Sequence, residues 1–245
     1  MPDRSGWNRQ PGFDLSGKRA LVVGAETAAG AAVTEAFQEA GASVIAVTTG
    51  DAGPDAWDVR DPAAIRSGME RLRDGGAPSI LVTAFDASFA APIIETTDEQ
   101  YRRTIGTIVD GTYYICRAFL RALPVDAADA RIICLTTVFG ERGIDNISAY
   151  AAAHGAVHNL VRALAQELGD RNGATVNGIA TGWMTDTSGR GPDDIAQNRL
   201  MRFVPMRRFG EPDEVAPLAV LLASPAAGYI SGQILHVDGG ITQHL

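Results

Sequence analysis

Short apolar runs alternate with alanine-rich, helix-like segments along most of the chain. The apolar runs, rich in β-branched residues, predict buried strands at residues 19–24, 43–49, 79–85, 130–137, 174–182 and 233–240. The segments between them predict helices at residues 28–41, 61–76, 97–123, 147–170 and 211–224. This alternation is typical of βαβ units arranged around a parallel sheet.

No repeat, low-complexity tract or change of composition marks a domain boundary. The sequence therefore predicts a single α/β domain over residues 14–245, doubly wound, with a parallel sheet of about seven strands and helices on both faces. Residues 1–13 lack the apolar middle of a secretory signal, and we expect them to form a loose N-terminal extension.

Composition narrows the classes of partner. The chain has 21 Lys and Arg against 29 Asp and Glu, a formal net charge of −8, and no long basic run, so we expect no nucleic-acid partner. No apolar run approaches the roughly 18–20 residues that a membrane span needs. Cys116 and Cys134 lie within apolar segments and are predicted to be buried free thiols. We expect a cytoplasmic protein that binds a small molecule.

A glycine-rich turn follows the first predicted strand. Gly24 stands at the end of that strand and Gly30 at the start of the next helix. Such a turn can direct backbone N–H groups and the positive end of a helix toward a pyrophosphate. Glycine turns also serve close packing of a helix on a sheet, so the turn alone leaves both interpretations open.

Four segments, taken in order, resemble the short-chain dehydrogenase/reductase family. They read DLSGKRALVVGA, DVRD, AYAAAHGAVHNLVRALAQELGDRNGATVNGIATG and RRFGEPDEVAPLAVLLASPAAGYISGQILHVDGG. The resemblance covers residues 14–240 and implies a Rossmann-like subunit that assembles as a homotetramer or homodimer. It also implies an activity on an alcohol or carbonyl substrate with NAD or NADP as cofactor.

The cofactor motif departs from the family pattern at its turn. Val23 replaces the threonine of the family motif, and Ala28 replaces its middle glycine. Glu26 stands where a small hydroxyl residue is usual, and a carboxylate beside a pyrophosphate is repelled unless it turns away.

The predicted adenosine end leaves the choice of cofactor open. The second strand ends in Thr48, Thr49 and Gly50, with neither the acid that holds a ribose nor a base for a 2′-phosphate. The resemblance implies that Asp58 lies near the adenine with Val59 as its apolar neighbour, while a helix-cap role for Asp58 is the alternative.

Acidic residues also enter at two later family positions. Asp86 replaces the last residue of an Asn-Asn-Ala-Gly segment, where glycine lets the backbone lie against the cofactor. In the segment ATGWMTD, Gly182 and Met184 keep an implied cofactor contact, and Asp186 replaces a threonine. With Glu26, these acids give a site that is eroded or repurposed, although each could be a solvated loop acid.

The catalytic positions are retained in part. The resemblance implies that Tyr150 moves the proton and that Thr137 stands for the family serine. His154 replaces the lysine that lowers the tyrosine pKa, and Ile108 replaces an asparagine beside it. We weigh a histidine whose pKa is raised by Asp86 or by Asp186 against a histidine that only fills space.

Two further possibilities concern the same region. His154 and His158 have the i, i+4 spacing of helical zinc ligands, but no third ligand can be identified, and no metal is expected. Trp183, Met201 and Phe203 fall in residues 183–208, which are predicted to form an apolar lid over the substrate, with loop packing as the alternative.

Three functions are compatible with these residues. The first is an oxidoreductase with an atypical Thr137–Tyr150–His154 site. The second is a redox-silent enzyme of the same fold, such as a dehalogenase, lyase or cyclase, that uses Tyr150 and Thr137 for acid–base chemistry and binds no nicotinamide. The third is a catalytically inactive subunit that assembles with an active relative.

Overall fold

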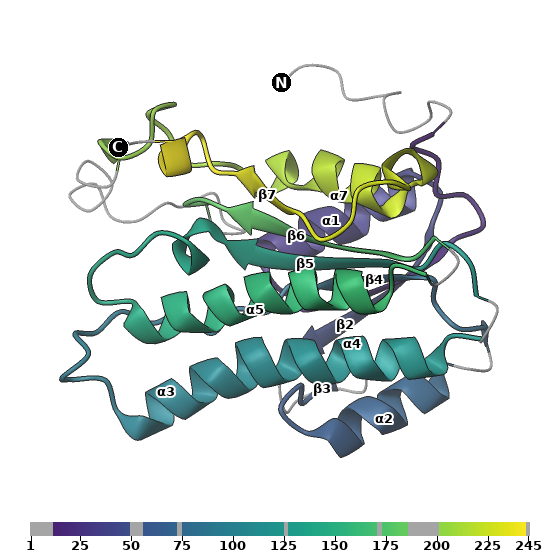
Figure 1. The fold of residues 1–245 in the computed structure, drawn as a ribbon, viewed down its shortest axis with the longest axis horizontal. Helices are drawn as coiled ribbons and strands as arrows, with labels where there is room; N and C mark the ends of the chain where they lie inside the picture. Colours follow the sequence, from purple (N-terminus) through teal and green to yellow (C-terminus); the bar gives the residue numbers. More distant parts are fainter. Residues whose placement is uncertain are drawn as a thin grey trace.

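A parallel sheet lies at the centre of the computed structural model, which describes residues 12–49, 56–72, 75–124, 127–170, 173–185 and 201–243. Within these residues seven strands follow the order β3-β2-β1-β4-β5-β6-β7 (Figure 1). The strands are β1 (Arg19–Val23), β2 (Ser43–Thr49), β3 (Ala56–Trp57), β4 (Ile80–Thr83), β5 (Arg131–Thr137), β6 (Thr175–Thr181) and β7 (Ile234–Val237). All neighbouring pairs are parallel, which confirms the predicted fold class.

Helices cover both faces of the sheet (Figure 1). One face carries α1 (Ala28–Glu39) and α7 (Ala216–Ala223). The other carries α2 (Pro62–Arg71), α3 (Asp98–Ile105), α4 (Gly111–Ala122) and α5 (Ser148–Glu167). Each face has its own apolar core, with Phe37 fully buried in the first and Phe119 in the second. The sheet is therefore covered on both sides, as its nearly continuous apolar strands require.

The starts of the helices follow local sequence signals. Thr27 caps α1, and Asp61 caps α2 with Pro62 at its first position, as the sequence predicts. Thr97 and Gln100 form a capping box at the start of α3. Side chains thus satisfy N–H groups that have no partner within these helices.

Two predicted helices are interrupted. The segment predicted as one helix over 97–123 contains a π-helical turn, η3 (Gly106–Asp110), between α3 and α4. This turn buries Ile108, and the adjoining Gly111 lies so close to Val59 that an added Cβ would come within 3.1 Å of it. Residues Pro212–Glu214 form a 3-10 turn ahead of α7. Neither interruption has a signal in the apolar pattern.

Two further observations concern predictions from composition. Cys116 and Cys134 are free and buried, as predicted. Among the described helices, none combines the length and the apolar character that a membrane crossing requires.

The order of the strands creates a crevice at their carboxyl ends. The chain leaves β1 toward one face and β4 toward the other, and such a switch point is where open α/β sheets bind ligands. Gly24 directly follows β1 with φ +94°, and an added Cβ would lie 2.3 Å from the carbonyl oxygen of Ala84. Glycine is therefore needed where these two turns meet.

Candidate active site

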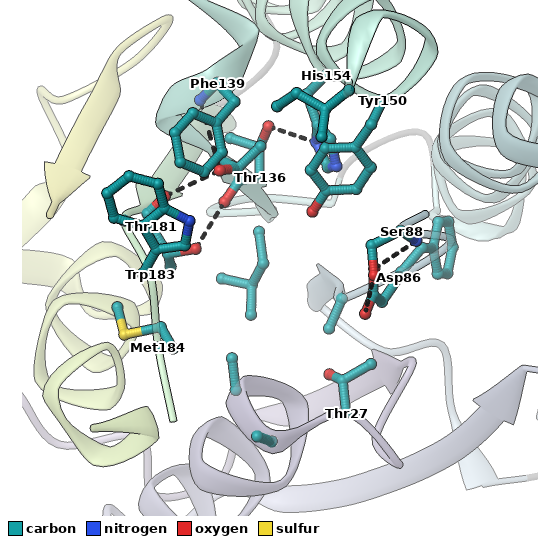
Figure 2. Close-up of a pocket in the computed structure, with 18 of the residues that line it drawn as sticks. Thr27, Asp86, Ser88, Thr136, Phe139, Tyr150, His154, Thr181, Trp183 and Met184 are labelled. Carbon is teal, nitrogen blue, oxygen red and sulfur yellow. Dashed lines mark hydrogen bonds between the residues drawn. The ribbon is translucent and has the colours of Figure 1, made fainter. Parts of the chain in front are cut away.

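A cavity of about 940 Å³ opens along this crevice. Its wall is formed by residues after β1, β4 and β6, by the end of β5 and by the first turns of α5. Figure 2 shows the Tyr150 hydroxyl pointing into the space, with Asp86 and Ser88 on one side and Thr181 and Trp183 on the other. One continuous space thus joins the glycine-rich turn to Tyr150.

The turn after β1 is tied together by the hydroxyl of Thr27. The Thr27 Oγ1 donates to the Gly24 carbonyl over 2.9 Å and accepts from the Gly30 N–H over 3.0 Å. Ala28 and Ala29 form the first residues of α1 and line the cavity. Gly24 and Gly30 are buried and shape the turn without lining the cavity. The positive end of α1 consequently faces the cavity through the two alanines.

The carboxylate of Glu26 reaches the carboxyl end of β2. It accepts hydrogen bonds from the Thr49 N–H, over 3.0 Å, and from the Thr49 hydroxyl. Glu26 also lines the cavity. The neighbouring Thr48, in β2, lies outside the cavity wall. An acid from the glycine-rich turn therefore occupies the strand end that lacks an acid of its own.

The two residues predicted near the adenine lie apart from the cavity wall. The Arg60 guanidinium, hydrogen-bonded to the Asp58 carboxylate at 2.9 Å, holds the pKa of Asp58 below its ordinary value. The alternative helix-cap role for Asp58 is wrong, because Asp61 caps α2. Val59 is buried under Gly111.

The predicted catalytic residues do come together. Thr137, Tyr150 and His154 all line the cavity. The Thr137 hydroxyl donates to the Thr181 carbonyl over 3.0 Å. Burial, and secondarily the charge of Asp86, raises the pKa of the Tyr150 phenol above its ordinary value of 10. Tyr150 is therefore protonated at neutral pH and suited to give a proton.

His154 is a buried, neutral imidazole. It is 3% exposed, its ring centroid lies 4.4 Å from that of Tyr150, and its Nδ1 lies 2.8 Å from the Thr136 hydroxyl. Burial, with a smaller effect of His158, lowers its pKa from 6.5 to about 3. The hypothesis that Asp86 or Asp186 raises this pKa is thus wrong for Asp86, and Asp186 lies outside the described residues.

The described part of the cavity wall contains acidic side chains but no Lys or Arg side chain. Asp86 is exposed there and accepts from the Ser88 N–H over 2.9 Å and from the Ser88 hydroxyl over 3.2 Å. Together with Glu26 it gives the described lining two carboxylates and no Lys or Arg. Groups of three or more metal-ligating side chains are also lacking over the described ranges.

The predicted lid is described only at its two ends, because residues 186–200 lie outside the described structure. Gly182, Trp183 and Met184 line the cavity, and the Trp183 ring lies 5.2 Å from that of Phe139. Met201 and Phe203 do not belong to the described lining, and Phe203 packs against a small buried cluster, so the lid stays a prediction.

Comparison with known proteins identifies the family. A family model described as enoyl-(acyl carrier protein) reductase matches residues 24–242. A 3-oxoacyl-(acyl-carrier-protein) reductase of Vibrio harveyi is 32% identical over 243 residues, covering 94% of this chain and 99% of that protein. A crystal structure of a short-chain type dehydrogenase/reductase from Mycobacterium marinum superposes with a TM-score of 0.84 at 28% identity, covering 94% and 97%. The chain belongs to the short-chain dehydrogenase/reductase family.

Two further similar proteins are named as dehydrogenases of a polyol and of a sugar acid. A galactitol 2-dehydrogenase (L-tagatose-forming) of Cereibacter sphaeroides is 37% identical over 238 residues, covering 94% of this chain and 87% of that enzyme. A gluconate 5-dehydrogenase from Burkholderia cenocepacia J2315, solved with NADP and tartrate, has a TM-score of 0.87 at 26% identity, covering 95% and 98%.

The positions expected from the short-chain dehydrogenase/reductase resemblance are partly kept and partly changed, and Tyr150 and His154 lie side by side on α5. The tyrosine and a hydroxyl remain, as Tyr150 and Thr137. The position at which the resemblance implies a lysine holds His154, whose pKa is lowered. The asparagine position holds Ile108, 1% exposed, whose carbonyl accepts from the Thr112 hydroxyl over 2.6 Å. A protonated phenol at Tyr150 and a neutral imidazole at His154 therefore stand where the resemblance implies a tyrosine and a lysine.

Proposed function

We propose that this short-chain dehydrogenase/reductase reduces the carbonyl group of a small molecule, with Tyr150 as the proton donor and a nicotinamide dinucleotide as the cofactor. The observation that carries the proposal is the continuous cavity between the start of α1 and the Tyr150 hydroxyl. The raised pKa of Tyr150 favours reduction over oxidation, because only the protonated phenol can donate.

The residues at the glycine-rich end fit a dinucleotide. The N–H groups of Ala28 and Ala29 stand at a helix start with no acid in its first turn, which suits a pyrophosphate. The Glu26 carboxylate, at the end of β2, suits the hydroxyls of an adenosine ribose. When bound, the nicotinamide supplies the hydride.

The chain's own residues would then orient the substrate and move the proton. Tyr150 donates its hydroxyl hydrogen to the carbonyl oxygen as that oxygen gains negative charge. Thr137 gives a second hydrogen bond to the same oxygen after its hydroxyl turns from the Thr181 carbonyl. Trp183 and Met184 provide an apolar wall that limits access of water.

A direct binding measurement tests the proposal. Calorimetric titration of the purified protein with NADH and with NADPH is expected to show saturable binding of one cofactor below millimolar concentration. Absorbance at 340 nm should then fall with a panel of small ketones and keto acids. Absence of binding of both cofactors at millimolar concentration would overturn the proposal.

Glu26 is expected to make the protein prefer NADH. A carboxylate at the end of β2 accepts hydrogen bonds from ribose hydroxyls and repels a 2′-phosphate, so NADH should bind at least ~10-fold more tightly than NADPH. Glu26→Gln should reduce this ratio to about threefold or less, measured by calorimetry. Glu35→Gln removes the same charge from an exposed position of α1 and should leave the ratio unchanged. Equal affinities in the wild-type protein contradict the prediction.

Asp86 is expected to suppress the reverse reaction. Its negative charge raises the pKa of Tyr150, so Asp86→Asn lowers that pKa and increases the tyrosinate fraction at any given pH. Alcohol oxidation at pH 9 should therefore rise by about threefold to tenfold in kcat. Asp98→Asn, an exposed acid in α3, serves as the control. An unchanged kcat for Asp86→Asn would show that its charge does not act on the phenol.

The acids in the cavity wall support a second candidate function, a redox-silent enzyme that uses Tyr150 and Thr137 for acid–base chemistry. Glu26 and Asp86 oppose a dianionic diphosphate, and the described lining offers no Lys or Arg to offset them. Tyr150-dependent conversion of a substrate without binding of either cofactor would identify this class. If the protein is instead an inactive subunit, loss of the Tyr150 hydroxyl should not change its behaviour. Assembly as a homodimer or homotetramer stays a prediction.

A further inference from the structure

A chain of polar side chains runs from the cavity wall toward the surface behind Tyr150. The Thr136 hydroxyl lies 2.8 Å from His154 Nδ1 and 3.0 Å from His158 Nε2. His158 Nδ1 in turn lies 3.2 Å from Glu141 Oε1. Thr136 and His158 are 5% and 1% exposed, whereas the Glu141 side chain is 35% exposed. The sequence analysis did not identify Thr136 or Glu141. It noted His158 only because that residue stands four positions after His154.

The Glu141 carboxylate determines which ring nitrogen of His158 carries the hydrogen. The Nδ1–Glu141 contact is not aligned as a hydrogen bond, but a bare nitrogen lone pair facing a carboxylate at 3.2 Å would be repelled. Nδ1 therefore carries the hydrogen. Burial lowers the pKa of His158, so at neutral pH its other nitrogen, Nε2, is bare and accepts from the Thr136 hydroxyl.

The same reasoning determines the tautomer of His154. The Thr136 hydroxyl has one hydrogen, which is directed at His158, so Thr136 must accept from His154 Nδ1–H. His154 Nε2 is then a bare acceptor. This atom is buried and has no hydrogen-bond partner within the described residues, and the residue His154 forms part of the cavity wall.

We propose that Glu141, His158 and Thr136 are positioning residues that set the state of His154 Nε2 and store a proton for the cavity. A proton accepted at His154 Nε2 sends the Nδ1 hydrogen to Thr136 and the Thr136 hydrogen to His158 Nε2. His158 becomes a cation beside Glu141, and His154 is neutral again with its hydrogen on Nε2. The reverse transfer returns one proton to the cavity, and no other atom moves between residues.

Groups on several elements face His158 and control how readily it holds this proton. Glu141, which follows the 3-10 turn after β5, favours the cation. Arg162, one turn along α5, and His236, in β7, oppose it. The backbone makes room for the ring at Gly140, where an added Cβ would lie 2.9 Å from His158 Cε1. The absence of a side chain at Gly140 therefore leaves the space that the His158 ring occupies.

Histidine tautomers measured by ¹⁵N NMR test this inference on the full chain without cofactor or substrate. The chain has four histidines, which single His→Gln variants assign. At pH 7.5 both His154 and His158 should show a hydrogen on Nδ1 and a bare Nε2. Thr136→Val should abolish the single fixed tautomer of His154, and Thr136→Ser should restore it. Thr175→Val, at a buried threonine whose hydroxyl has no partner among the described residues, should change neither signal.

A second variant tests the surface end. Glu141→Gln should lower the measured pKa of His158, because the charge that favours its cation is removed. A hydrogen on His154 Nε2 in the wild-type protein at pH 7.5, or a fixed His154 tautomer in Thr136→Val, would overturn the proposal. The use of the stored proton in catalysis rests on the proposed function. The NMR signals of the histidines do not depend on that function, so a failure of the proton-storage proposal can be told apart from a failure of the proposed function.

Discussion

Tyr150→Phe is expected to lower kcat for carbonyl reduction by about 10²- to 10⁴-fold, the usual contribution of a positioned proton donor. The substitution removes one oxygen and keeps the ring that packs against His154, so the fold and the cavity should persist. Cofactor affinity should change by less than about threefold, because the hydroxyl acts on the substrate oxygen. Steady-state kinetics and calorimetric titration measure the two quantities.

A matched tyrosine variant separates this loss from a general effect. Tyr229 is fully exposed, so Tyr229→Phe should retain wild-type kcat and melting temperature. A loss smaller than about threefold for Tyr150→Phe, with folding intact, would remove Tyr150 from the mechanism and favour an inactive subunit.

Acid is expected to destabilise the protein strongly through His154. In the unfolded chain this histidine takes up a proton below its ordinary pKa of 6.5, but in the folded protein only below about 3. Between these values the unfolded state binds more protons, so the free energy of unfolding falls as the pH falls. The full shift corresponds to ~5 kcal/mol, and part of this loss should be visible by pH 5.

Urea unfolding between pH 7.5 and pH 4 measures the effect. His154→Gln cannot titrate and should show a shallower fall than the wild-type protein. His236→Gln, at a side chain that is 27% exposed, should keep most of the wild-type slope. Parallel slopes for wild type and His154→Gln would mean that His154 does not stay neutral in the folded state.

Much of the fold could be predicted because parallel strands covered on both faces read as continuous apolar runs. Each of the six predicted strands overlaps an observed one. The two-residue β3 (Ala56–Trp57) could not be predicted, since two residues carry no periodicity. The π-helical turn around Ile108 could not be predicted either, because five residues are too few to show a period of their own.

The composition of the site was easier to predict than its chemistry. The spacing of Tyr150 and His154 places both on one face of α5, and the structure puts both at the cavity. The charge state of His154 depends on burial and on Thr136 in β5, which lies 18 residues earlier in the chain. Likewise, the reach of Glu26 to Thr49 depends on which strands are neighbours. Such long-range contacts have no signature in a local pattern.

The hydroxyl of Thr27 closes the turn after β1 before any ligand arrives. Because it holds both the Gly24 carbonyl and the Gly30 N–H, the backbone around Ala28 already has one conformation. Ordering a loop on binding costs conformational entropy that is subtracted from affinity, and a turn fixed in advance avoids that cost. An anion at the start of α1 would therefore meet a rigid receptor, and its affinity would reflect charge and shape more than the ordering of the protein.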